Sequence, residues 1–314
     1  MSESDDLIGE LGRIGLRYGD APPEVLPTRP DVIIVRAGSV VVKAHAPGAA
    51  GEPLALRMRA ARHPALRGIL LEPVTEEVME VHGRLVTVWP TGVPVDHDAP
   101  QAAPWEAGAR LLARMHAVPP DALPPLPASG GPPRVEQVVA RLRGDSAAER
   151  VVRRAFDCLP GLGGEPGQTL APGQAPASGD GRRLLAHGDW HMGQMVRHRG
   201  EWILIDADDM GVGDPAWDLA RPAAWFAAGL LEPEAWHRFL GAYRAEGGCA
   251  VPPDGDPWER LEVPAQALTV QLAAAAVATA ARQERELDEV ETMLIDTCHR
   301  IVKFRSACHS VATQ

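Results

Sequence analysis

The pattern of hydrophobic and polar positions divides the chain into a first part with strand-like segments and a later part dominated by helical ones. Residues 32–45 form two β-rich runs around a Gly-Ser turn, and residues 52–62 have the pattern of a helix. Residues 69–75 and 84–89 have the composition of further strands. The segment "PTGVPVD", which starts at Pro90, interrupts this pattern with proline and glycine. We therefore expect a β-rich unit that ends near this break.

Helical spacing prevails after the break. The segments that predict helices are residues 105–116, residues 134–158 and everything from about Pro215 onward, apart from a loop at 247–257. A Gly/Pro/Ala-rich stretch at 160–183 indicates a linker, and two short strand-like segments follow it. Because strands come first and helices later, we expect an α+β fold of two lobes, with a small β-rich lobe over residues 1–90 and a larger, mostly helical lobe over residues 91–314.

Composition and charge narrow the classes of function. The net charge of −11 argues against a nucleic-acid surface, and it fits either simple solubility, the more common cause, or a cationic substrate. There is no run of 18 apolar residues, which argues against a membrane segment, and the acidic start "MSESDDLIGELG" lacks a signal pattern. We therefore expect a cytoplasmic protein. Its four cysteines form no C-x-x-C pair, so zinc binding and dithiol redox chemistry are not indicated.

Lysine is rare in this chain. Of 31 basic residues only two are lysines, Lys43 and Lys303, and the others are arginines. Lys43 follows the β-branched run Val40–Val42, so the pattern places it near the end of a strand. A lysine retained in such an arginine-rich chain indicates a role that requires an ammonium group, and we favour a phosphate ligand over a surface charge.

The segment "LLAHGDWHMGQM" and the residues after it carry the candidate chemistry. Asp189 and Gln194 are five residues apart, and Asp206 follows at the end of a second apolar run. The link "RHRG" between the two runs predicts a hairpin that brings all three side chains together. Carboxylate and amide oxygens suit Mg²⁺ beside a phosphate. The alternative is that Asp189 and Asp206 are ordinary surface acids. A lone aspartate in an apolar run has a desolvation cost, however, and this favours a functional role for it.

The order of these residues matches the general kinase template, in which a strand lysine, a catalytic-loop carboxylate, an amide five residues later and a metal-binding aspartate follow one another. The segments "HGDWHMGQM" and "LIDADDMGVGDPAWDLA" resemble the signature of the aminoglycoside phosphotransferase and choline-kinase-like superfamily. The resemblance spans roughly residues 30–300 and is strongest at 187–220. It implies a two-lobed, protein-kinase-like fold that transfers the γ-phosphate of ATP to a hydroxyl group of a small molecule.

The resemblance also implies roles for individual residues. Asp189 would be the catalytic base and Asp206 the main Mg²⁺ ligand, joined by Gln194. Lys43 in the nucleotide-binding lobe would hold the α- and β-phosphates. It also implies that Glu52 pairs with Lys43 and that Val88, Trp89 and Thr91 lie beside adenine. Asp208 would be a second metal ligand. His187, Asp214 and Asp218 would support the catalytic loop. Glu52 serves equally well as a first-turn residue that favours the helix dipole.

Two departures from the family pattern leave the acceptor open. Gln194 stands where most of the family has asparagine, and this form is similar to maltokinases and glucosamine kinases. The "GDPAWDLA" segment instead resembles the antibiotic-kinase branch, which together with the acidity favours an aminoglycoside or similar cationic acceptor. No G-x-G-x-x-G motif precedes Lys43, and only Gly38-Ser39 lies close in sequence, so Ala37–Val40 would be a minimal phosphate loop. A nucleotide-binding pseudokinase is therefore the alternative of another class.

Several other residues can be interpreted either as structural or as functional. His191 is expected to be a structural histidine, and Asp209 a solvated turn residue as readily as a ligand. Three tryptophans could line a sugar or amine site: Trp217, Trp225 and Trp236. At helical spacing, such residues more often belong to the hydrophobic core. The acidic run at 284–291 predicts a solvated helix face.

Overall fold

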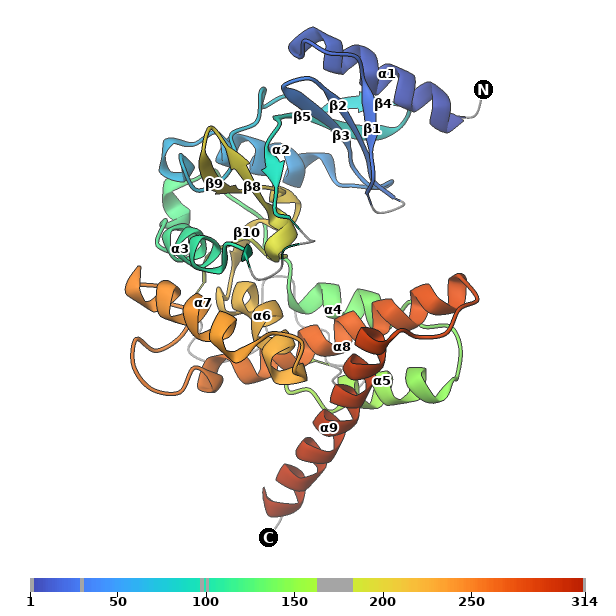
Figure 1. Cartoon of the computed structure of the whole chain (residues 1–314), viewed down its shortest axis with the longest axis vertical. Coiled ribbons are helices and arrows are strands. Elements are labelled where there is room, and N and C mark those ends of the chain that lie inside the picture. The colour runs from blue at the N-terminus through green and yellow to red at the C-terminus, as the bar shows by residue number, and fades with distance from the viewer. Residues whose placement is uncertain (1–2, 29–30, 97–98, 100–101, 163–182, 313–314) are drawn as a thin grey trace.

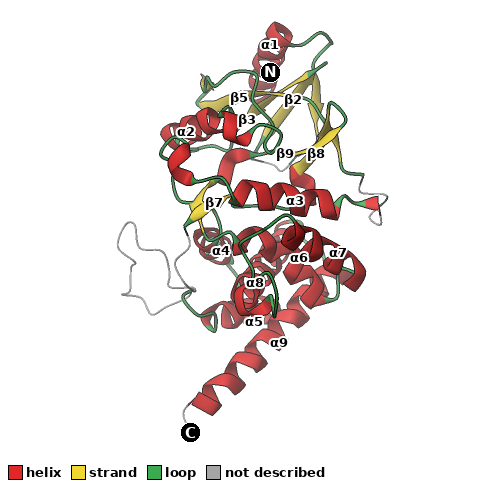
Figure 2. Ribbon diagram, turned by 90° about the vertical axis from the view of Figure 1, so that its left-hand side faces the viewer, coloured by secondary structure: helices red, strands yellow, loops and turns green. Residues whose placement is uncertain are grey.

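The computed structural model describes residues 3–28, 31–96, 99, 102–162 and 183–312. Its first part is a five-stranded antiparallel sheet in the order β1-β2-β3-β5-β4. The strands are β1 (Glu24–Leu26), β2 (Ile33–Ala37), β3 (Val40–Ala44), β4 (Met79–Val81) and β5 (Arg84–Pro90). The predicted strands at 32–45 and 84–89 are confirmed. The strands occupy the upper part of the molecule and the long helices the lower part (Figures 1 and 2).

One face of the sheet is covered by α1 (Glu3–Tyr18), a helix that the sequence analysis did not anticipate. Leu7, Leu11 and Ile14 recur at helical spacing on α1 and are buried against the sheet. The sheet contributes Val35 and Val88 to this small core. The helix predicted at 52–62 is α2 (Gly51–Ala61), which lies beside the short turn Ala207–Asp209 of the candidate site.

The expected strand at 69–75 is wrong. Only Leu70 makes an isolated bridge, which pairs it with Leu204, and the backbone N–H of Leu71 donates to the carbonyl of Leu204 over 2.8 Å. This segment therefore crosses from the five-stranded sheet to the strands of the catalytic region instead of extending the sheet. The contact ties the two parts of the chain together next to the predicted metal ligands.

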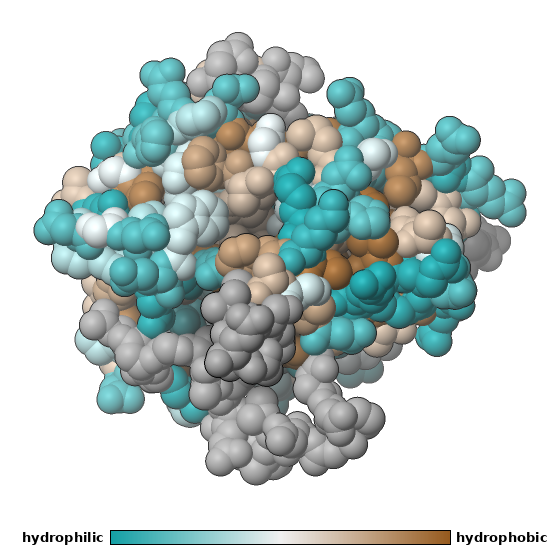
Figure 3. All heavy atoms as spheres, turned by 90° about the horizontal axis from the view of Figure 1, so that it is seen from below, coloured by the Kyte–Doolittle hydropathy of each residue, from teal (hydrophilic) through white to brown (hydrophobic). Residues whose placement is uncertain are grey.

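The remaining part is mostly helical, as predicted. Its helices are α3 (Trp105–His116), α4 (Pro132–Val139), α5 (Ala147–Asp157), α6 (Ala216–Ala228), α7 (Pro233–Ala245), α8 (Trp258–Arg282) and α9 (Glu289–Ala312). The single helix expected at 134–158 is two helices, because Ser146 and Glu149 form a capping box that starts α5. Seen from the lower end, hydrophilic and hydrophobic residues alternate on the surface of this part (Figure 3).

Two further expectations concern loops. The acidic run at 284–291 is not a continuous helix face, because residues 284–288 connect α8 to α9 and only its last residues enter α9. Arg285 pairs with Glu291 across this connection, at 2.7 Å for each of two bonds. The expected linker at 160–183 lies almost entirely outside the described residues.

Short strands carry the candidate site between these two parts. The predicted hairpin is present as β8 (Met195–His198) and β9 (Glu201–Leu204), and β6 (Val93–Pro94) pairs with β8. Arg199 and Gly200 make the turn with φ of 52° and 90°, the left-handed values that a tight hairpin requires. The remaining pair, β7 (Leu184–Ala186) and β10 (Gly211–Gly213), flanks the catalytic segment.

The helix α8 is long and apolar enough to cross a membrane by length and composition alone, with a mean hydropathy of 1.4 over its best window. In the structure 67% of that window is buried, against α4, α6 and α9. Its small residues Ala267, Ala273 and Ala274 are fully buried and allow these helices to approach closely. The helix thus forms the centre of the larger core.

Candidate active site

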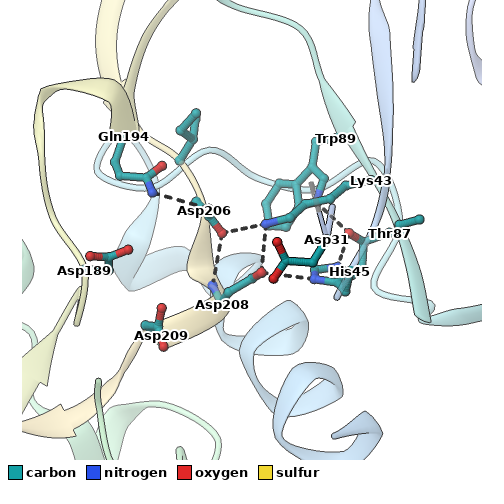
Figure 4. A network of polar contacts seen from close by, with 12 residues as sticks. Asp31, Lys43, His45, Thr87, Trp89, Asp189, Gln194, Asp206, Asp208 and Asp209 are labelled. Carbon is teal, nitrogen blue, oxygen red and sulfur yellow. Dashed lines mark hydrogen bonds and ion pairs between the residues drawn. The ribbon is translucent and has the colours of Figure 1, made fainter. Parts of the chain in front are cut away.

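Strand β3 delivers Lys43 to the site. Its neighbours Val42 and Ala44 are buried in the sheet, and the register pairs Lys43 with Ile34 on one side and Thr87 on the other. Lys43 Nζ donates to Asp206 Oδ1 at 2.7 Å and to Asp208 Oδ2 at 2.8 Å (Figure 4). Burial disfavours the charged ammonium, but the two carboxylates outweigh it and raise the pKa of Lys43.

Asp206 lies at the end of β9 in the left-handed conformation, with φ of 64° and ψ of 77°. Aspartate tolerates this conformation better than most residues, and it directs the carboxylate back toward Lys43. Gln194 Nε2 donates to Asp206 Oδ2 over 3.3 Å, and the backbone of Ile205 donates to the Gln194 carbonyl over 2.9 Å. The hairpin therefore brings Gln194 and Asp206 together, as the spacing predicted.

Asp208 belongs to a hydrogen-bonded chain that the sequence did not reveal. His45 Nδ1 lies 3.1 Å from Asp208 Oδ2, His45 Nε2 lies 2.8 Å from Thr87 Oγ1, and Trp89 Nε1 donates to the same hydroxyl over 2.9 Å. All partners are satisfied if Trp89 donates to Thr87, Thr87 to His45 and His45 to Asp208. Burial opposes ionisation of Asp208, but Lys43 and His45 hold its pKa far below the usual range.

The expected partnership of Glu52 with Lys43 is not present in the structure. Glu52 lies exposed in the first turn of α2, whereas the ion pairs of Lys43 go to Asp206 and Asp208. Asp208 thus takes the place expected for Glu52. The physical reason is that the loop after β9 passes directly beneath Lys43, so two carboxylates already neutralise the ammonium.

Asp189 is held by two arginines that the sequence analysis did not single out. Arg134 from the first turn of α4 lies 2.8 Å from Asp189 Oδ2, and Arg221 from α6 lies 3.1 Å from Asp189 Oδ1. Arg134 also pairs with Asp209, whose side chain is 35% exposed, so this turn residue is ion-paired and only partly solvated. Burial raises the pKa of Asp209 even though Arg134 opposes that shift. Asp189 and Asp209 lie on the side of Asp208 away from Lys43 (Figure 4).

The backbone of the catalytic loop is fixed from α6. Asp218 is fully buried and accepts hydrogen bonds from the backbone N–H of His187 (2.7 Å) and of Gly188 (2.8 Å). Gly188 has φ of 87°, and a Cβ there would lie 2.1 Å from the carbonyl oxygen of Asp209, so only glycine fits. His187 Nε2 reaches the carbonyl of Ile205 at 2.8 Å and ties the loop to the segment before Asp206.

The other predicted supports also have defined positions. Asp214 accepts from the backbone of Ala216 at 3.0 Å and from Arg260 at 2.9 Å, so it starts α6. His191 Nδ1 accepts from the backbone of Gly193 at 3.0 Å. Burial and the charge of Arg221 lower the pKa of His191 to about 4, so its imidazole is neutral. Trp236 stacks on aromatic neighbours in the core, and Trp217 borders a small cavity beside Asp189.

A cavity of about 520 Å³ opens between the five-stranded sheet and the catalytic hairpin. Its lining includes Lys43, Gln194 and Asp206 at one end, and Trp89, Thr91 and Gly92 where β5 leaves the sheet. Residues from β1, β2 and their connection cover it, among them Leu26, Thr28, Val32 and Ile34. The volume is in the range of pockets that hold small ligands.

Val88 does not reach this cavity. Its side chain is fully buried in the core beneath α1, and its carbonyl accepts from the backbone of Val74 at 3.0 Å. Trp89 and Thr91 do line the cavity, and their contact with adenine stays a prediction. A Cβ on Gly92 would lie 2.5 Å from Val196 Cγ2, so glycine lets the chain pack closely on β8 at this point.

Ala37–Val40 is also not the loop above the phosphate end. The register pairs Val40 with Pro90, so this turn lies at the far end of β3 from Lys43. The β1–β2 connection instead reaches the cavity at the lysine end, with Thr28 and Val32 in its lining. Glycine is absent from this connection in the sequence "PTRPDV". Of the described residues of this connection, Thr28 and Val32 line the cavity.

The residues present fit a Mg²⁺ ion in part. Asp206, Asp208 and Gln194 can offer carboxylate and amide oxygens, the ligands that Mg²⁺ prefers, and the Lys43 ammonium already lies between the two carboxylates. In the described part of the chain, no group of three or more His, Cys, Asp or Glu side chains could hold a metal. A Mg²⁺ ion here would therefore depend on Gln194, phosphate oxygens and water as well. Asp208 as a ligand stays a prediction.

Comparison with known structures supports the fold. A choline/ethanolamine kinase family protein from Mesorhizobium loti superposes with a TM-score of 0.59 at 16% identity, over 95% of this chain and 94% of that one. The choline kinase from Streptococcus pneumoniae gives 0.59 at 15% identity, over 96% and 99%. A thermostable mutant of an aminoglycoside phosphotransferase, in complex with AMP-PNP and hygromycin B, gives 0.56 at 15% identity, over 93% and 97%. The expected two-lobed kinase-like fold is confirmed.

Sequence comparison identifies the family. No curated protein sequence matches the chain significantly. The family model described as "Phosphotransferase enzyme family" matches residues 31–262, which includes the strand of Lys43, the catalytic loop and the "GDPAWDLA" segment. This range covers well over half of the chain and includes Lys43, Asp189, Gln194, Asp206 and Asp208. The chain therefore belongs to the phosphotransferase enzyme family.

Proposed function

We propose that this phosphotransferase moves the γ-phosphoryl group of Mg²⁺-bound ATP to a hydroxyl group of a small molecule. The observation that carries the proposal is the convergence of Lys43, Gln194 and Asp206 at one end of a 520 Å³ cavity, with Asp189 beyond them on the catalytic loop. Trp89, Thr91 and Gly92 line the cavity where β5 leaves the sheet, and a nucleotide base would lie there. The cytoplasm, where ATP is plentiful, stays the expected compartment.

Each residue has a role that follows from its surroundings. Lys43 is charged and buried, so it would bind phosphate oxygens without the screening that weakens surface charges. Gln194 and Asp206 would hold Mg²⁺, which when bound neutralises charge on the phosphates. Asp189 would accept or orient the hydroxyl proton of the acceptor. In this arrangement catalysis depends on position and electrostatics, which is typical of phosphoryl transfer.

The chain also carries features that bear on the pseudokinase alternative. The β1–β2 connection has no glycine in its sequence, and glycine is the residue that allows backbone N–H groups to approach phosphates closely in a glycine-rich loop. Lys43, Gln194, Asp206 and Asp189 are nevertheless all present, and Lys43 is already ion-paired beside the predicted metal ligands. These residues favour an active enzyme over a protein that only binds nucleotide.

Two acceptor classes remain candidates from the sequence. The acidity of the chain and the "GDPAWDLA" segment favour an aminoglycoside or similar cationic compound, and one structural neighbour is an aminoglycoside phosphotransferase bound to hygromycin B. Gln194 in place of asparagine favours a sugar or amino sugar. Neither argument uses the residues that surround Asp189.

The test is ADP release from Mg²⁺-ATP by the full chain across aminoglycosides, hexoses, amino sugars and hydroxylated acids. Asp189→Asn should abolish acceptor-stimulated release, whereas Asp145→Asn, an exposed residue before α5, should leave it unchanged. Stimulation that depends on Asp189 supports a kinase and selects the acceptor class. Nucleotide binding without acceptor-dependent release by any class would favour the pseudokinase, and absence of nucleotide binding would contradict the roles of Lys43 and Asp206.

A further inference from the structure

The two carboxylates beside the acceptor position, Asp189 and Asp209, are both paired with arginines, which is unfavourable for a site that would bind a cation. The small cavity beside Asp189 is about 10 Å³, room for roughly one water molecule. Among its lining residues one is acidic, Asp189, and two are basic, Arg134 and Arg221. With Asp209, which pairs with Arg134 from outside this lining, the two guanidinium groups and the two carboxylates balance, although the whole chain carries −11.

Arg221 has hydrogen-bonding capacity that the described protein atoms do not use. Its side chain is 15% exposed, and its Nε is fully shielded from solvent without a hydrogen-bond partner among the described residues. Only its terminal nitrogen reaches Asp189, at 3.1 Å. A buried N–H donor without an acceptor is costly, so this position requires an oxygen atom from outside the described residues, supplied by a water molecule or by a ligand that replaces it.

The other polar groups in the lining would assist the same kind of ligand. Gln271 from α8 is buried and borders the cavity, where its amide can donate a hydrogen bond. Arg134 is 26% exposed, so it is the arginine that faces solvent and an incoming molecule. Trp217 provides an apolar wall close to Gly131.

The carboxylates of this region are already neutralised. Arg134 pairs with both Asp189 and Asp209, and Arg221 pairs with Asp189. An ammonium group of a cationic acceptor would have to displace a guanidinium from one of them and then lie beside it. An oxyanion would instead add to the guanidinium groups, which bind carboxylates and phosphates through two parallel N–H groups.

We propose that the acceptor of this phosphotransferase carries an oxyanion, a carboxylate or a phosphate ester, which Arg221 and Arg134 bind while the acceptor hydroxyl faces Asp189. This inference rests on the proposed function. The oxyanion would use N–H groups of the two arginines that do not bind Asp189, among them Arg221 Nε. Asp189 would keep its ion pairs and accept the hydrogen bond of the hydroxyl group.

The experiment measures binding to the full chain by calorimetry, with Mg²⁺ and AMP-PNP present and the ionic strength constant. The probes share one sugar ring and differ in charge: glucuronate, glucose 6-phosphate, glucose and glucosamine, with hygromycin B as a polycationic aminoglycoside. We expect at least one anionic probe to bind about 10-fold or more tightly than glucose, glucosamine and hygromycin B. Preference for glucuronate identifies a carboxylate acceptor, and preference for glucose 6-phosphate identifies a phosphate ester.

Arginine variants test whether the preference arises at this cavity. Arg221→Gln should weaken binding of the preferred anion by about 10- to 100-fold and leave AMP-PNP binding unchanged, because charge-assisted hydrogen bonds are lost. Arg221→Lys keeps the charge and loses the paired N–H geometry, so an intermediate loss is expected even if Arg221→Gln fails to fold. Arg238→Gln is the matched control and should have no effect, because Arg238 is exposed on α7 and pairs only with Glu106 among the ion pairs of the described residues.

The outcomes separate this inference from the proposed function. Tighter binding of a cation or of glucose, no binding of either anion, or a preference that survives both Arg221→Gln and Arg134→Gln would overturn the oxyanion assignment while nucleotide binding stands. Loss of AMP-PNP binding in the unaltered chain would overturn the proposed function instead, and the charge preference can then be measured without nucleotide.

Discussion

The carboxylate of Asp218 accepts a hydrogen bond of 2.7 Å from the backbone N–H of His187, which lies 31 residues earlier in the chain. The same carboxylate accepts from Gly188 N–H at 2.8 Å and lies 2.9 Å from His116 Nε2. Asp218 is fully buried, so water cannot take the place of its carboxylate as the acceptor for these N–H groups. The first turn of α6 therefore determines where the catalytic loop, and with it Asp189, is held.

Asp218→Asn should weaken both the fold and the reaction. The amide has one acceptor oxygen, and its NH₂ group would face an N–H donor, so at least one backbone bond is lost together with the charge opposite His116. We expect a decrease of about 3 kcal/mol in the free energy of unfolding and a fall of roughly 100-fold in turnover from misplacement of Asp189. Urea unfolding and ADP release measure the two effects. Asp145→Asn is the control, and a loss below about 0.5 kcal/mol would contradict the anchoring role.

Lys43→Met should make the protein respond more strongly to Mg²⁺. Methionine has a similar length but no charge, so Asp206 and Asp208 would face each other without the ammonium that now lies 2.7 and 2.8 Å from them. We expect a loss of about 3 kcal/mol in stability, because a buried ion pair loses one partner. A divalent cation can then replace the missing charge, so Mg²⁺ should raise the melting temperature of the variant more than that of the unaltered chain.

The other lysine provides the control for this experiment. Lys303 is exposed on α9, so Lys303→Met removes the same charge away from the site and should leave the Mg²⁺ dependence unchanged. AMP-PNP affinity should fall in Lys43→Met alone. An equal response to Mg²⁺ in both variants would show that the two aspartates do not attract a divalent cation.

Local spacing was sufficient to predict the centre of the site. Lys43 follows a β-branched strand, and the hairpin turn at "RHRG" brings Gln194 beside Asp206, because both relationships depend on short segments. The helix α1 could also have been found, since Leu7, Leu11 and Ile14 have helical spacing and all are buried. These features are local, and periodicity is a local signal.

The partners of those residues could not be predicted in the same way. Asp208 pairs with Lys43 in place of Glu52, and Lys43 and Asp208 are 165 positions apart in the sequence. Arg134 and Arg221 reach Asp189 from two different helices, and nothing in their own segments marks them among the many other arginines of the chain. Such contacts depend on how α4 and α6 both pack on α8, which the sequence of either helix does not specify.

Gln194→Asn should raise the Mg²⁺ concentration needed for half-maximal ADP release. Gln194 is 9% exposed and touches Asp206 through its amide, so a side chain shorter by one methylene would withdraw the amide from the metal position. We expect an increase of roughly 10-fold, in the range seen when groups around a metal are altered. Gln283→Asn, in the exposed connection after α8, is the matched control. An unchanged Mg²⁺ titration would mean that the amide does not take part in metal binding.

His191 should remain neutral through the physiological range. Its pKa lies at about 4, lowered by burial first and by the charge of Arg221 second. An unfolded chain binds a proton at this residue near pH 6.5, and the folded chain does not do so until about pH 4. The contribution of His191 to the free energy of unfolding is therefore fully present above about pH 6.5 and is lost as the pH falls from 6.5 toward 4.

NMR titration of the histidine ring nitrogens measures this directly. The bond from Gly193 N–H to Nδ1 requires the tautomer with the proton on Nε2, which has distinct nitrogen shifts. Arg221→Gln removes one of the charges that lower the pKa, so it should shift the titration upward, but only in part because burial is the larger cause. Arg238→Gln should leave the titration unchanged. A midpoint near 6.5 in the unaltered chain would show that His191 is solvated, and the pH dependence of activity between 6 and 8 could then include this residue.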